Sequence, residues 1–200
     1  MVYGEVPLPN GQVQRMSEVA IPMSSAGESR PDTARRNYTA ADVAFMRHMI
    51  AHHAQALVMT ALVPSRSARA EMRLLAERIE VSQHDEIAQM RRWLAARGEE
   101  VPQVVPEHAH HAAGAETMPG MLTEAELAQL SRASGAQFDR LFLRFMIRHH
   151  EGAITMVQQL FRSPGAGQET ELFRVASDVE ADQRAEIARM RALLAALPPG

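Results

Sequence analysis

One sequence pattern occurs twice in the chain: residues 42–59 read DVAFMRHMIAHHAQALVM, and residues 139–156 read DRLFLRFMIRHHEGAITM. The two copies lie 97 residues apart (139 − 42). In both, apolar residues recur at spacings of three and four, which predicts a helix with one buried face. Each copy also carries a methionine that is followed, three and four residues later, by two adjacent histidines. The pattern therefore predicts two equivalent helices with histidines on or beside the buried face.

A second pair of matching stretches lies farther along each copy. Residues 83–91 read QHDEIAQMR, and residues 183–191 read QRAEIARMR, at an offset of 100. Each half of the chain is thus a pair of helices joined by a turn. One such hairpin cannot bury its own apolar face, whereas two copies packed face to face can. We expect an all-α protein whose core is a four-helix bundle built from two repeated hairpins.

Proline, glycine and polar clusters divide the chain into four segments. Pro64-Ser65-Arg66-Ser67 is expected to break the first hairpin between its helices, and Thr123-Glu124-Ala125-Glu126 is a capping box that opens a short extra helix. Helices are expected over about 39–63, 68–97, 123–133, 136–161 and 168–197. The segments are an irregular N-terminal arm (1–37), the first hairpin (38–98), a linker with the short helix (99–135) and the second hairpin (136–200), with both hairpins in one domain.

Composition excludes several classes of function. The chain has 200 residues, no cysteine and a net charge of −3, so disulfides, thiolate chemistry and an electrostatic case for nucleic-acid binding are all absent. No apolar run reaches the length of a membrane span. The N-terminus lacks the charged-then-apolar order of a signal peptide, so the protein is either cytoplasmic or has lost a signal or membrane tether before Met1. The sequence leaves open whether the protein forms a homo-oligomer.

The repeated histidines favour a metal-binding function. Met49 lies one helical turn from His52 and His53, so the three side chains can meet at one ion. Met146 has the same relation to His149 and His150. Thioether and imidazole ligands favour copper, above all Cu(I), over magnesium, calcium or manganese. The alternative is a buried hydrogen-bond network that only stabilises helix packing.

Other residues extend this hypothesis. His48 and His52 have a spacing that suits two-imidazole chelation, whereas Met59 and Met156 lie farther along their helices and would serve a second site or simply pack. Glu86 and Glu186, with Gln83 and Gln183, either orient the histidines or bind metal directly. Asp42 and Asp139 are most simply helix-start residues. The linker adds candidate ligands of the same kind: His108, His110, His111, Met118 and Met121.

At these residues the chain resembles the DUF305 family. The resemblance rests on the doubled HHxxAxxM pattern, on Met118-Pro119-Gly120-Met121 and on the repeated stretches near Gln83 and Gln183. It implies a ferritin-like four-helix bundle, usually exported or membrane-tethered in bacteria, with some members linked to copper binding and copper resistance. The chain departs from the family in lacking an export signal. Its two repeats also differ, since Gln55-Ala56 stands where the second repeat has Gly152-Ala153.

We expect a non-enzymatic protein that binds copper, as Cu(I) or Cu(II), and buffers or chaperones it outside the cytoplasm. A ferritin-like redox enzyme is the weaker alternative, because such di-iron sites use two Glu-x-x-His motifs and these four helices contain none. A structural or partner-binding bundle whose histidines are core residues is the third.

Overall fold

The computed structural model describes residues 37–103 and 118–198. The described residues form helices and contain no strand. The helices, in chain order, are α1 (Ala40–Thr60), α2 (Val63–Arg66), α3 (Ala70–Ala96), α4 (Glu124–Arg132), α5 (Gly135–Arg162) and α6 (Thr170–Ala196).

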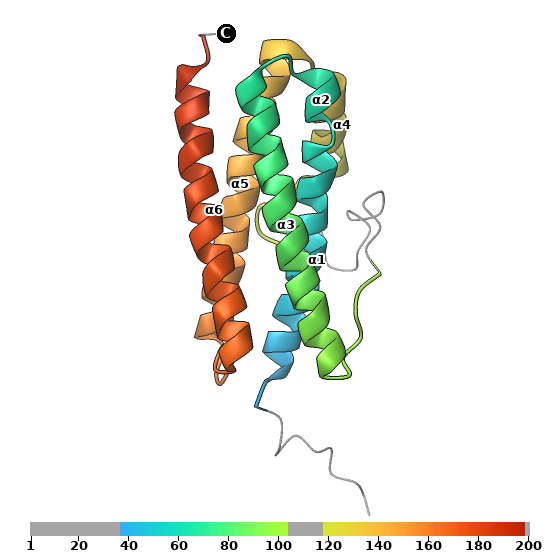
Figure 1. The fold of residues 1–200 in the computed structure, drawn as a ribbon, viewed down its shortest axis with the longest axis vertical. Helices are drawn as coiled ribbons and strands as arrows, with labels where there is room; N and C mark the ends of the chain where they lie inside the picture. Colours follow the sequence, from blue (N-terminus) through green and yellow to red (C-terminus); the bar gives the residue numbers. More distant parts are fainter. Residues whose placement is uncertain (1–36, 104–117, 199–200) are drawn as a thin grey trace, which may run out of the picture. The chain divides into compact units, whose positions relative to one another are not determined.

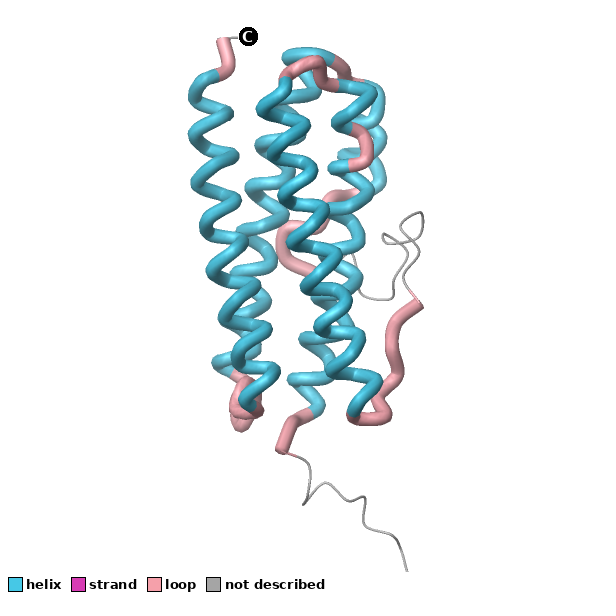
Figure 2. Tube along the Cα trace, in the orientation of Figure 1, coloured by secondary structure: helices cyan, strands magenta, loops and turns pink. Residues whose placement is uncertain are grey.

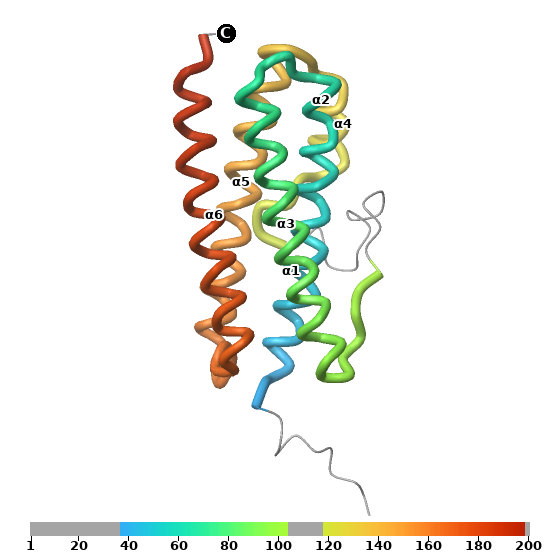
Figure 3. Tube along the Cα trace, viewed as in Figure 1, coloured from blue at the N-terminus to red at the C-terminus, as the bar shows by residue number. Residues whose placement is uncertain are grey.

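Four long helices form a bundle, with α1 and α6 running in one direction and α3 and α5 in the other (Figure 1). Helices α1 and α3 make the first hairpin, and α5 and α6 make the second. The hairpins pack so that α1 contacts α5 and α3 contacts α6. Following the chain colours in Figure 3 shows that helices in contact run antiparallel. The predicted all-α four-helix bundle is confirmed.

Capping side chains explain where α1, α4 and α6 begin. Thr39 and Asp42 form a capping box at α1, and Thr123 and Glu126 form one at α4. At α6, the Glu169 side chain accepts hydrogen bonds from two backbone N–H groups of the first turn. Helix α6 therefore begins at Thr170, two residues later than expected, because Glu169 acts as its N-cap.

The break expected in the first hairpin separates α1 from α3, and it contains a further helix. This short helix, α2, covers Val63–Arg66. Pro64 lies in the first turn of α2, where the fixed φ of proline suits a helix and where no helical hydrogen bond needs the N–H that proline lacks. The chain then extends at Ser67, and α3 begins at Ala70 rather than Ala68.

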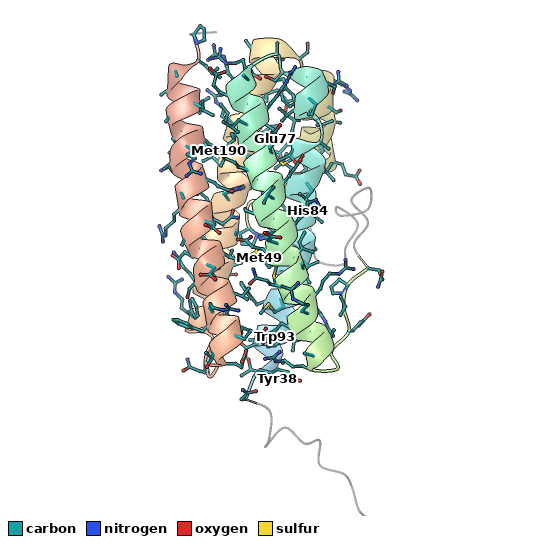
Figure 4. All side chains as sticks on the ribbon, viewed as in Figure 1. Tyr38, Met49, Glu77, His84, Trp93 and Met190 are labelled. Atoms are coloured by element: carbon teal, nitrogen blue, oxygen red, sulfur yellow. The ribbon has the colours of Figure 1, made fainter. Side chains whose placement is uncertain are left out.

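The core consists of two apolar clusters separated by a polar layer. One cluster includes Met49, Trp93 and Val179, and the other includes Met59, Ile79 and Met190. Figure 4 shows Trp93 and Met190 toward opposite ends of the bundle. Along each of the four long helices, buried polar residues separate the part that joins one cluster from the part that joins the other. We call these residues the polar layer: His52, His53, Gln55, Gln83, Glu86, His149, His150, Gln183 and Glu186.

The predicted N-terminal arm and the linker histidines His108, His110 and His111 lie outside the described residues. Within the described ranges, no helix is long and apolar enough to span a membrane.

Candidate metal centre

Each hairpin holds one histidine against a glutamate. The His53 Nε2 atom of α1 lies 2.5 Å from Glu86 Oε2 of α3, and the His150 Nε2 atom of α5 lies 2.6 Å from Glu186 Oε2 of α6. All four side chains are at least nine-tenths buried. Since an ionised carboxylate only accepts, the imidazole Nε2–H donates in both pairs. The predicted inward position of the two glutamates is where the structure places them.

The other two histidines meet at the interface between the repeats. The His52 and His149 ring centroids are 3.8 Å apart, with an angle of 35° between the ring planes. Within each repeat the neighbouring histidine rings are farther apart, at 6.4 Å for His52–His53 and 6.1 Å for His149–His150. The structure thus joins the two predicted sites into one row of four imidazoles across the α1–α5 contact.

A loop covers this row on one side. We call residues 118–122 the crossing loop, and Figure 2 shows it as a loop segment near mid-height of the bundle. The His52 Nε2 atom lies 3.0 Å from the Pro119 carbonyl oxygen. The Gln55 amide donates to the Leu122 carbonyl at 2.9 Å and accepts from the Leu122 N–H at 2.8 Å.

Helix α5 meets the crossing loop with a glycine. A Cβ atom on Gly152 would overlap the Pro119 carbonyl group and lie 2.8 Å from the Gly120 Cα atom. Gly120 itself has a φ of +78°, and a Cβ there would meet the Arg148 carbonyl oxygen at 2.5 Å. Glycine is needed at both positions because two backbones touch.

The difference between the repeats now has a structural explanation. Gln55 and Gly152 occupy equivalent repeat positions, and both contact the crossing loop. Gln55 holds the loop by hydrogen bonds, whereas Gly152 makes room for it. The loop also breaks the symmetry of the histidines, since the Pro119 carbonyl bonds to His52 and not to His149.

Burial keeps the central histidines neutral. Desolvation, with the neighbouring His53, lowers the pKa of His52 from 6.5 to about 3. Desolvation, followed by the nearby His52, lowers the pKa of His149 well below 6.5. A neutral imidazole has one nitrogen lone pair free to bind a metal or accept a hydrogen bond.

The polar layer contains buried imidazole nitrogens without hydrogen-bond partners. These atoms, all in the described residues, are His52 Nδ1, His53 Nδ1, both nitrogens of His149 and His150 Nδ1. Unpaired buried polar atoms cost about 1–3 kcal/mol each, and native proteins rarely leave several together. Imidazole nitrogens suit copper, zinc, iron and nickel. The positions of these unpaired atoms are not those of an assembled site, because in the described residues no three His, Asp or Glu side chains converge on one point.

The candidate methionine ligands on the helices lie in the two apolar clusters rather than in the polar layer. Met49 and Met156 lie in one apolar cluster, and Met59 and Met146 lie in the other. Met118 of the crossing loop is buried, and Met121 is half-buried against the same apolar cluster as Met49. Thioether groups therefore border the polar layer from both apolar clusters.

His48 is not part of the layer. It is exposed, whereas His52 is fully buried, so the expected chelating pair of these two side chains is not formed. Sequence reasoning also overlooked Gln55 and Pro119 as contacts of the histidine row. The signal available for Gln55 was its mismatch with Gly152.

Comparison with known proteins gives the family. A family model named domain of unknown function DUF305 matches residues 42–194. The chain belongs to the DUF305 family. No functionally curated protein matches it.

Solved structures of similar proteins include two DUF305 members. A DUF305 fragment from Deinococcus radiodurans is 37% identical, with a TM-score of 0.67, over 79% of this chain and 97% of that one. A putative secreted DUF305 protein from Streptomyces coelicolor is 31% identical, with a TM-score of 0.65, over 80% and 93%. CopM in its Cu(II)-bound form is 27% identical, with a TM-score of 0.61, over 77% and 95%.

Proposed function

We propose that this DUF305 protein binds copper through the four histidines of the polar layer. The observation that carries the proposal is the set of five buried imidazole nitrogens that lack hydrogen-bond partners. In the histidines that bond to Glu86 and Glu186, Nε2 donates and Nδ1 keeps its lone pair. A carboxylate that holds the second nitrogen of a metal-binding histidine orients the ring and raises its basicity.

The chemistry of the surrounding side chains supports copper over harder cations. Imidazole suits copper in both oxidation states, and the thioethers of Met49 and Met146 select Cu(I). CopM, which shares the fold, is known in Cu(II)-bound, Cu(I)-bound and silver-bound forms, at 26–27% identity to this chain. Silver(I) and Cu(I) prefer the same soft ligands.

Binding requires the histidine row to rearrange. The His52 and His149 rings, whose planes are tilted by 35°, must turn so that their lone pairs converge. The role is binding, buffering or chaperoning without catalysis. A location outside the cytoplasm is part of the proposal and draws on the Streptomyces relative that is described as secreted.

The test is an anaerobic Cu(I) titration in competition with a chromophoric chelator. The parent protein should withdraw Cu(I) from the chelator. The double variant His52→Ala with His149→Ala should bind at least about tenfold more weakly, because two ligands are removed. His84→Ala is the matched control, since His84 is an exposed histidine on α3 (Figure 4) and its loss should leave binding unchanged. Equal Cu(I) affinity for the double variant and the parent would end the proposal.

The alternative is a polar layer that serves only to specify helix packing. The two short imidazole–carboxylate hydrogen bonds and the neighbouring His52 and His149 rings favour it. A ligand that binds only the native state raises the melting temperature. This alternative therefore expects the melting temperature to stay constant when Cu(I) is added, whereas copper binding expects a rise that disappears in the double histidine variant.

A further inference from the structure

A groove between α3 and α6 opens on the side of the bundle where these two helices face solvent. Its volume is about 570 Å³. Five carboxylates line it against a single guanidinium, that of Arg78, and the carboxylates are Glu77, Asp85, Glu86, Asp178 and Asp182. The groove is thus a concave surface of strongly negative charge, which concentrates cations from solution.

Glu86 connects this groove to the polar layer. Its Oε2 atom accepts the hydrogen bond from His53, while its Oε1 atom is buried and has no partner. Only 5% of the residue is exposed, yet it forms part of the groove lining. An ionised oxygen in this position needs a donor or a cation, because an unpaired buried charge is costly.

Glu186, the equivalent glutamate of the other repeat, has the hydrogen-bond donor that Glu86 Oε1 lacks. Glu186 Oε1 accepts a hydrogen bond from Ser82 Oγ at 3.1 Å. The repeat counterpart of Ser82 is Asp182, which lines the same groove as Glu86 and cannot donate when ionised. Partial burial raises the pKa of Asp182, and the negative charges of Glu86, Glu186 and Asp178 raise it further. Glu186 therefore has a hydroxyl donor for its Oε1 atom, whereas the equivalent position near Glu86 holds a second carboxylate.

We propose that Glu86 and Asp182 bind a hydrated divalent cation of the magnesium or manganese class in the α3–α6 groove. Such cations keep several waters and are commonly bound by one or two carboxylates. The site differs from the copper proposal in its ligands, which are carboxylate oxygens at the α3–α6 groove rather than imidazoles, although Glu86 also contacts His53.

The test uses Mn²⁺ alone, followed by the loss of the free-ion signal in electron paramagnetic resonance. The parent protein should bind one equivalent. Asp182→Ser, which copies the serine found in the other repeat, should weaken Mn²⁺ binding roughly tenfold or more because one of two charged ligands is lost. Asp182 is exposed, so the variant should fold, and its circular dichroism and melting temperature check this.

Glu77→Gln is the matched control. It removes the same charge from the same groove, but Glu77 lies nine residues from Glu86, about 13 Å along α3. That separation exceeds the screening length of about 8 Å at physiological salt, so affinity should fall less than about twofold. No saturable Mn²⁺ binding by the parent, or equal losses in the two variants, would overturn the site. Cu(I) titration of Asp182→Ser should match the parent, which separates failure of this site from failure of the copper proposal.

Discussion

Gly152→Ala tests whether the crossing loop is held against α5 by backbone contact. In the middle of an exposed helix, replacing glycine with alanine stabilises a protein by about 1 kcal/mol, because alanine loses less conformational entropy on folding. At Gly152 the new Cβ would overlap the Pro119 carbonyl group. The obstacle is backbone on both sides, so no side chain can rotate away to make room.

The expected cost follows from the contacts that the loop would lose. Moving the loop away breaks the His52–Pro119 hydrogen bond and both Gln55–Leu122 hydrogen bonds. At about 1 kcal/mol each, these sum to about 3 kcal/mol. The gain in helix propensity offsets about 1 kcal/mol, so the free energy of unfolding should fall by about 2 kcal/mol. The sign is opposite to that of an ordinary glycine-to-alanine change in a helix.

Urea denaturation followed by Trp93 fluorescence measures this change. Thr155→Ala, at an exposed position one turn farther along α5, is the control and should stay within about 0.5 kcal/mol of the parent. Gln55→Ala completes a double-mutant cycle. Alone it should destabilise by about 1–3 kcal/mol, but in the Gly152→Ala background it should cost much less, because its bonds to the loop are already broken. A stabilising Gly152→Ala, or additive effects, would refute the proposed contact.

Three further predictions address the ends and the charges of the bundle. Glu169→Ala should lower the free energy of unfolding by about 2–4 kcal/mol in urea denaturation. The substitution removes the N-cap of α6 and the carboxylate that accepts the buried Trp93 N–H at 2.8 Å. A loss below about 0.5 kcal/mol would contradict the capping role of Glu169. Burial lowers the pKa of His52 to about 3 in the folded protein, so only the unfolded chain gains a proton on this group as pH falls below 6.5. The free energy of unfolding of the parent should therefore fall by about 2 kcal/mol from this group between pH 7 and pH 5. His52→Gln should reduce this pH dependence in urea denaturation midpoints, and an unchanged dependence would count against a neutral buried imidazole. The Arg148 side chain lowers the pKa of Glu126 to about 2, so this partly exposed pair stabilises the protein above pH 4.5 and loses its effect as pH falls toward 2. Arg148→Ala should lower the free energy of unfolding by less than about 1 kcal/mol at pH 7 and should leave it unchanged near pH 2. A loss of stability that persists at pH 2 would indicate that Arg148 acts through packing rather than charge.

The sequence was informative about the site wherever its residues act through their position on a helix. Helical periodicity places side chains on a common face, so the inward positions of His53 and Glu86 could be predicted from spacing alone. The repeat predicted that His150 and Glu186 would follow the same pattern, and the structure has both pairs at hydrogen-bond distance. These relations depend on local geometry and on the duplication.

Contacts between the hairpins could not be predicted in the same way. Spacing along α1 relates His52 only to residues of its own helix, such as Met49, whereas packing of α1 against α5 places His52 beside His149. Periodicity defines which face of a helix is buried, whereas the rotation and offset of one helix on another depend on how the side chains of both interlock. His48 illustrates the same limit, since a turn of helix separates an exposed imidazole from a fully buried one.

Hydrophobic periodicity and an internal repeat are local properties of the chain, so they were enough to predict an all-α bundle of two repeated hairpins with buried histidines. The row of four histidines, the crossing loop on one side of it and the unpaired Glu86 oxygen at the α3–α6 groove could be seen only in the packed structure. These features arise where segments distant in sequence touch. Gln55, Gly152 and the Ser82–Asp182 difference acquire meaning only from the backbone or carboxylate that packing brings beside them.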